Sequence, residues 1–178
     1  NILTNQDILN IMATKDIGLE FKTDTRFSYC NTNYAMLALI IEKITKLSYE
    51  KAMKQIIFEP LGMKNTYVFD YERDKDSAVT SYKGNKVEIG LDYLDAVYGD
   101  KNIYSTPRDL LKFDRARNTP DFLTPEIISM VYTPYSNEHK GRKNYGLGIR
   151  MVNWETGQNF YFHNGWWHGN TSSYITLQ

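Results

Sequence analysis

The sequence predicts a domain of the α+β class, in which an antiparallel sheet is flanked by helices and joined to a mainly helical lobe. Apolar residues recur at helical spacing in the first half of the chain, and from Tyr145 onward the apolar period falls to two, as in a strand. We therefore expect one domain over 1–178, with the helical lobe and its long loops in 1–140 and the antiparallel strands in 141–178.

Capping residues mark the expected helix starts. Thr4, followed three positions later by Asp7, predicts a short first helix, and Ser48 predicts another start. Between them lies a long helix whose buried stripe is expected to be Leu37, Ile40, Ile41 and Ile44. The helix after Ser48 should complete an αα-hairpin and end at Pro60. Its expected inner face is Tyr49, Ala52, Met53, Ile56 and Ile57.

The second half of the chain should alternate loops, helices and strands. The segment 69–99 has weak periodicity and predicts long loops with short strands. Thr-Pro pairs at 106–107 and 124–125 predict two helices, the first with Leu110, Leu111 and Phe113 facing inward. The last segment predicts a meander of about three strands: one from Tyr145 to Met151, one over 159–163 after a turn at 155–158, and one over 173–177. The strand pattern continues to the last residue, so we expect a domain truncated at both ends.

Composition excludes several classes of function. Lys+Arg and Asp+Glu both number 21 and the isoelectric point is near 7.0, which disfavours binding to nucleic acid or to an anionic membrane surface. No apolar run reaches the roughly 18 residues that an integral membrane segment needs, and the first residues lack a signal-peptide pattern. The single cysteine, Cys30, cannot form an internal disulfide and is expected to be a small buried apolar residue.

Two short motifs carry the functional interpretation, Tyr29-Cys30-Asn31 before the long helix and His163-Asn164-Gly165 in an aromatic strand. Four further segments accompany them, at 48–49, 57–66, 104–110 and 145–148. In these residues the chain resembles the penicillin-recognising serine hydrolases, the group of class C β-lactamases, D,D-peptidases and related esterases. The resemblance covers the middle and later part of that β-lactamase/transpeptidase-like domain.

The resemblance implies a role for each motif residue. Tyr29 would exchange a proton with a nucleophilic serine and the leaving group, and His163 would orient the tyrosine or the substrate. Asn31, Gly165 and the backbone N–H of Trp166 would bind the substrate. The implied reaction passes through an acyl-enzyme on an ester, amide or D-amino-acid peptide bond, without metal or organic cofactor. The partner would be a small-molecule or peptide substrate, and location in the periplasm or outside the cell is favoured over the cytoplasm.

The family's Ser-x-x-Lys element has no counterpart before Tyr29, so we expect the isolated chain to be inactive. Ser48-Tyr49-Glu50-Lys51 matches the pattern but follows Tyr29, and a helix cap explains Ser48.

Simpler explanations exist for single residues and for the chain. Asn31 alone is a typical helix cap, His163 alone a hydrogen-bonded strand residue, and His139 and His168 are expected to be exposed loop residues without a metal. A noncatalytic receptor or sugar-binding module would use the same cleft, with Trp166 and Trp167 as contacts. Exposed sheet edges would also permit self-association.

Overall fold

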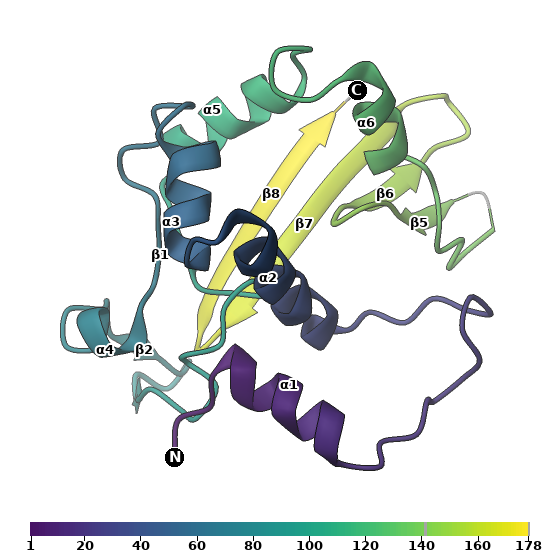
Figure 1. The fold of residues 1–178 in the computed structure, drawn as a ribbon. Helices are drawn as coiled ribbons and strands as arrows, with labels where there is room; N and C mark the ends of the chain where they lie inside the picture. Colours follow the sequence, from purple (N-terminus) through teal and green to yellow (C-terminus); the bar gives the residue numbers. More distant parts are fainter. Residues whose placement is uncertain (141, 178) are drawn as a thin grey trace. The chain divides into compact units, whose positions relative to one another are not determined.

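The computed structural model describes residues 1–140 and 142–177. The chain, whose ribbon is drawn in Figure 1, divides into two compact units. Unit 1 contains Asn1–Gly18, Cys30–Lys112 and Trp167–Gly169, and unit 2 contains Leu19–Tyr29, Phe113–Trp166 and Asn170–Gln178. Helices and antiparallel strands are both present, which confirms the predicted α+β class. In the two described ranges, no helix has the length and apolar character to cross a bilayer.

Unit 1 is mainly helical. Its elements are α1 (Asn5–Thr14), α2 (Asn31–Thr45), α3 (Tyr49–Met53), the π-helix η1 (Lys54–Phe58) and α4 (Tyr71–Asp74). Two small antiparallel sheets pair β1 (Tyr67–Val68) with β4 (Ile103–Tyr104), and β2 (Ser81–Tyr82) with β3 (Glu88–Ile89). Thr4 and Asp7 form the predicted capping box, and Ser48 accepts a hydrogen bond from the Lys51 N–H, so both predicted caps are confirmed.

A buried asparagine joins three segments of unit 1. The Asn5 side chain is fully buried and donates to the carbonyls of Ala35, at 2.9 Å, and Tyr98, at 2.8 Å. Its carbonyl oxygen accepts the Tyr98 N–H at 3.0 Å. One amide therefore satisfies backbone groups of α2 and of the loop near residue 98, which would otherwise be buried without partners.

The buried face of α2 differs from the prediction. Leu37, Ile40 and Ile44 are 49%, 50% and 75% exposed, whereas Ala35 and Ala38 are buried. A Cβ added to Gly99 would lie 2.7 Å from the Tyr34 carbonyl oxygen and 2.8 Å from the Ala38 Cβ. The chain at Gly99 thus packs directly on the helix backbone, which only a face of small side chains permits.

The helix after Ser48 also turns a different face inward. Ile56 was predicted to be buried but is 54% exposed, and Phe58 is buried instead. The cause is η1, in which the Glu59 N–H bonds to the Lys54 carbonyl five residues back. A π-turn takes more residues per turn than an α-turn, so the buried face shifts along the sequence.

Two helices follow the predicted Thr-Pro signals, α5 (Pro107–Arg117) and α6 (Pro125–Val131). The Thr106 and Thr124 hydroxyls accept hydrogen bonds from the N–H groups of Asp109 and Ile127, as expected of caps. Leu111 is 48% exposed, so its predicted inward position is wrong. Asp109 is buried instead, where it accepts hydrogen bonds from the Asn65 N–H and the Thr66 hydroxyl.

Unit 2 is built on a four-stranded sheet in the order β5-β6-β7-β8. Its strands are β5 (Lys143–Tyr145), β6 (Arg150–Asn153), β7 (Asn159–Trp167) and β8 (Asn170–Leu177). The predicted single strand from Tyr145 to Met151 is instead a hairpin, in which Tyr145 pairs with Arg150 and Leu147 is 53% exposed. Gly148, at φ +78°, supplies the left-handed turn that breaks the strand.

Helix α6 covers the core of the unit 2 sheet. Ile149, Met151 and Tyr161 are buried, and Val131, Tyr132 and Tyr174 pack against them. A Cβ on Gly146 would lie 2.1 Å from the Val131 carbonyl oxygen, so the hairpin turn approaches the end of α6 closely.

Replacement of Asn5 by alanine should destabilise the protein by about 3 kcal/mol, because buried backbone groups would lose their partners. Urea denaturation measures the change. Asn10, exposed on the same helix, is the matched control, and Asn10→Ala should stay within about 0.5 kcal/mol of the wild type. Equal effects of the two substitutions would contradict the bridging role of Asn5.

Candidate active site

Four rings and one guanidinium gather in unit 2, and we call this group the ring cluster: Phe27, Tyr29, Tyr145, Arg150 and His163. The Tyr29 and His163 ring centroids are 6.1 Å apart. Tyr145 meets Tyr29 edge-on at 5.9 Å and packs on Phe27 at 5.2 Å. The tyrosine of the first motif and the histidine of the second are therefore neighbours.

The two tyrosines of the cluster differ in exposure. Tyr145, at the end of β5, is 4% exposed, whereas Tyr29 is 43% exposed. Both rings also lie beside the Arg150 guanidinium. Of the two phenols, Tyr29 is the one that a bound molecule could reach.

The hydrogen bonds of His163 define its tautomer. Nδ1 lies 2.9 Å from the Asn164 carbonyl oxygen, which can only accept, so Nδ1 carries the proton of the neutral ring. Nε2 lies 3.0 Å from the Tyr145 hydroxyl and accepts its proton. Tyr145 thereby orients the imidazole, a role that no signal in the sequence indicates beyond its position at the start of the Tyr-Gly-Leu-Gly segment.

The environment of His163 disfavours its charged form. Burial lowers the pKa of His163 below the ordinary 6.5, and the nearby Arg150 charge acts in the same direction. The hydrogen bond to the Asn164 carbonyl opposes both, but the net shift is downward. A neutral imidazole is consequently favoured at pH 7.

Arg150 lies over both tyrosines. Its guanidinium carbon is 5.4 Å from the Tyr29 ring centroid and 5.5 Å from that of Tyr145, within the range of cation–π attraction. Its ion pair with Glu138, at 3.7 Å, is too long for a hydrogen bond. A positive charge at this position favours a negative charge on either phenol. The sequence pattern places Arg150 only on a strand, because spacing alone cannot show which rings a side chain covers.

Three other residues of the sequence prediction have less distinctive surroundings. Trp166 is 72% exposed on β7. A Cβ on Gly165 would lie 2.5 Å from the Ser172 Oγ, so the neighbouring strand by itself favours a glycine here. Asn31 belongs to unit 1, where it is the first residue of α2 and exposed.

The cap interpretation of Asn31 is wrong, since Cys30 occupies the N-cap of α2 and forms no side-chain cap bond. Cys30 is exposed, contrary to the prediction of a buried apolar residue. The backbone is extended at Cys30, at φ −141°, and this conformation places the N-cap at Cys30 and makes Asn31 the first helical residue.

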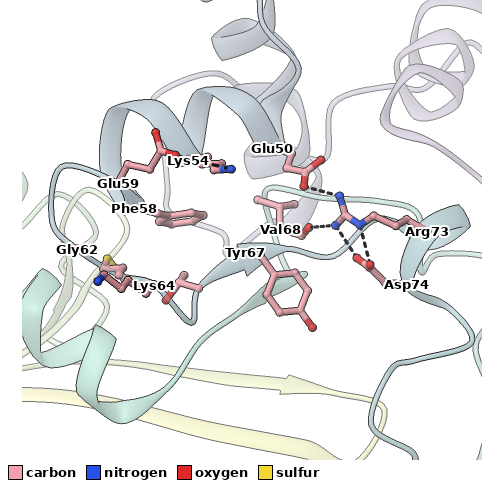
Figure 2. A pocket seen from close by; sticks show the side chains of 12 residues that line it. Glu50, Lys54, Phe58, Glu59, Gly62, Lys64, Tyr67, Val68, Arg73 and Asp74 are labelled. Carbon is pink, nitrogen blue, oxygen red and sulfur yellow. Dashed lines mark hydrogen bonds and ion pairs between the residues drawn. The ribbon is translucent and has the colours of Figure 1, made fainter.

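A cavity of about 660 Å³ lies in unit 1 (Figure 2) and shares no residue with the ring cluster. Figure 2 shows Arg73 between Glu50 and Asp74. The N–O distances of these two ion pairs are 2.5 and 2.7 Å. Its other guanidinium contact is the Val68 carbonyl at 3.1 Å. Because these groups neutralise Arg73, the cavity offers no free guanidinium to an anionic ligand, and none of the motif residues lines it.

In the described part of the chain, one group of three side chains has the composition of a metal site: Asp92, Asp95 and His168, all in unit 1. The imidazole of His168 is only 15% exposed, which corrects the prediction of an exposed loop residue. His139 is exposed, as predicted.

Comparison with known proteins identifies relatives of this chain. It is 28% identical to "Penicillin-binding protein 4*" of Bacillus subtilis, over 98% of this chain and 42% of that protein. It is 30% identical to "Teichoic acid D-alanine hydrolase" of Staphylococcus aureus, over 67% of this chain and 31% of that protein. The chain thus spans less than half the length of these two relatives.

Solved structures also resemble this fold. The octameric penicillin-binding protein homologue from Pyrococcus abyssi superposes with a TM-score of 0.74 at 26% identity, covering 91% of this chain and 38% of that one. This likeness confirms the fold expected from the motifs. Residues 11–177 match the Beta-lactamase family model, and the chain therefore belongs to the beta-lactamase family.

Proposed function

We propose that the protein containing this chain is a serine hydrolase that cleaves an ester, amide or D-amino-acid peptide bond through an acyl-enzyme. The contact of Tyr29 with His163 and Tyr145, within a member of the beta-lactamase family, carries this proposal. The name of one relative, "Teichoic acid D-alanine hydrolase", favours a substrate with a D-amino acid.

In the proposed reaction, a serine elsewhere in the longer protein attacks the substrate carbonyl. Tyr29 accepts the serine proton, and the carbonyl becomes an oxyanion that the Trp166 N–H and the serine N–H stabilise. Collapse of this intermediate breaks the scissile bond, and Tyr29 returns the proton to the leaving group. Water then hydrolyses the acyl-enzyme by the same sequence of proton transfers.

A free phenol ionises near pH 10, so Tyr29 needs positive charge nearby to act as a base at neutral pH. His163 is favoured as the neutral form, so it is suited to holding the rings in place and less suited to supplying charge. Arg150, over the Tyr29 ring, is the cation that the cluster contributes, together with the lysine expected beside the serine. Asn31 and Gly165 would bind the substrate, as the family resemblance implies.

The isolated chain should not turn over substrate. Its residues before Tyr29 contain one serine, Ser28, which is followed by Asn31 at the lysine position of Ser-x-x-Lys. When the purified chain is incubated with p-nitrophenyl acetate, nitrophenol should be released no faster than by spontaneous hydrolysis in buffer alone. Turnover that disappears in Tyr29→Phe would contradict this expectation.

In the longer gene product, Tyr29→Phe should lower kcat by roughly 10² to 10⁴-fold, because the proton-transfer group is lost and the ring is kept. A fluorophosphonate probe followed by mass spectrometry first identifies the labelled serine. Tyr135→Phe removes the hydroxyl of a tyrosine that is 55% exposed and lies outside the ring cluster, so it serves as the control with unchanged kcat. Equal rates for Tyr29→Phe and the control would refute the assigned role.

The pKa of His163 should lie below 6.5 in the folded chain, and Arg150→Gln should raise it, whereas Arg150→Lys should leave it low. As the pH falls, His163 is protonated in the unfolded chain before it is protonated in the folded chain. The stability conferred by His163 is therefore present above about pH 6.5 and is lost as the pH falls toward the folded pKa. NMR titration, with His163→Gln to assign the signal, measures the shift. An unchanged value in Arg150→Gln would exclude an electrostatic effect of the guanidinium.

A further inference from the structure

We propose that Asp92, Asp95 and His168 form a binding site for one divalent transition-metal ion of the Zn²⁺ type. The site lies within unit 1, and the inference does not rest on the proposed function.

The distances between the candidate ligand atoms suit such an ion. His168 Nε2 is 3.1 Å from Asp95 Oδ1 and 3.5 Å from Asp92 Oδ2, and all three atoms lie within 4.8 Å of one another. Ligands at the usual zinc distances in a tetrahedron are about 3.3 Å apart. The two distances from His168 Nε2 to the aspartate oxygens are therefore already close to the separation that zinc ligands need.

The histidine nitrogen is oriented toward this space without a hydrogen bond. Nε2 of His168 is a buried atom with no hydrogen-bond partner in the described residues, although Asp95 Oδ1 is only 3.1 Å away. The distance is adequate, so the missing bond reflects direction: the nitrogen does not point along the line to that oxygen. A ligand between the nitrogen and the two carboxylates would satisfy it.

The carboxylate of Asp95 is held in place by other donors. Its Oδ1 accepts the indole N–H of Trp167 at 2.6 Å, and its Oδ2 accepts the backbone N–H of Asp92. The side chain is 3% exposed. Hydrogen bonds of this kind to a ligating carboxylate are the usual second layer of a metal site, because they fix the direction of the ligand oxygens.

Local charge and access also favour a cation. Lys101 lies 4.5 Å above the Trp167 ring, but its charge is paired with Asp100 at 2.9 Å, which leaves the two ligand carboxylates in excess. Asp92 is 38% exposed and gives an ion a path from solvent. One imidazole with two carboxylates suits Zn²⁺ or Mn²⁺ better than Ca²⁺ or Mg²⁺, which prefer oxygen ligands alone.

The bound ion would connect the loop of Asp92 and Asp95 to the turn of His168 and Gly169. Both turn residues have positive φ, +46° and +74°, as in the type I′ turn of a two-residue hairpin. The expected consequence is a more rigid turn when metal is present.

Isothermal titration of the full, untagged chain with ZnCl₂ tests the site. One ion should bind per chain, and Asp92→Asn and His168→Gln should each weaken binding at least about tenfold. Trp167→Phe keeps an aromatic ring and removes the N–H donor to Asp95, so it should weaken binding roughly 10 to 100-fold. His139→Gln removes an exposed histidine and should leave the affinity unchanged. MgCl₂ should not compete.

Three results would overturn the proposal. No saturable binding of Zn²⁺ by the wild type would leave His168 as an ion-pair partner of the two aspartates. Equal affinity of the wild type and Asp92→Asn, a conservative change at a half-exposed position that should fold, would place the ion elsewhere. Loss of binding in His163→Gln together with full binding in His168→Gln would assign the ion to the ring cluster.

Discussion

The pairing of Tyr145 with Arg150 across a tight hairpin is the constraint on which the ring cluster depends. This register places a phenol and a guanidinium side by side at the end of two strands, and both meet Tyr29. A slip of one residue would reverse the faces of the strand and remove either group from the cluster. The turn is closed by the hydrogen bond from the Gly146 N–H to the Ile149 carbonyl at 2.8 Å, and Gly146 has no room for a side chain.

The same register connects the apolar core of unit 2 to the ring cluster. Met151 follows Arg150 directly and pairs with Tyr161 in the core, under the residues that α6 contributes. Since neighbouring strand residues point to opposite sides, the burial of Met151 and Tyr161 fixes the side to which Arg150 points. Packing of Met151 and Tyr161 thus fixes the direction of the neighbouring Arg150 side chain.

Local patterns predicted the start of helices well, because a cap depends on residues close together in sequence. Thr4, Ser48, Thr106 and Thr124 all act as expected. The buried faces were harder to predict. Leu37 and Ile40 follow helical spacing yet are exposed, since the surface that packs on α2 requires the small Ala35 and Ala38. Likewise, no local pattern reveals the π-turn that exchanges Ile56 for Phe58.

The candidate site residues show the same division. Motif order and flanking segments were enough to select Tyr29 and His163, although their separation in sequence says nothing about distance. Tyr145 and Arg150 could not be selected in this way, because their importance lies in contacts with those two residues. The alternation of apolar residues also gave a wrong prediction. It indicated one strand through Gly146 and Gly148, where the chain in fact turns back.

The exposure of the two tyrosines assigns them different tasks. Tyr145 is buried and its proton is committed to His163 Nε2, so its anionic form would lose both solvation and that hydrogen bond. Tyr29 retains exposed surface and shares the same cation. Arg150 is nearly equidistant from the two rings, at 5.4 and 5.5 Å, so exposure and hydrogen bonding are what make Tyr29 the preferred phenol for contact with a bound molecule. A cluster with two equivalent tyrosines would lack this preference, and the hydrogen bond between Tyr145 and His163 is what makes them unequal.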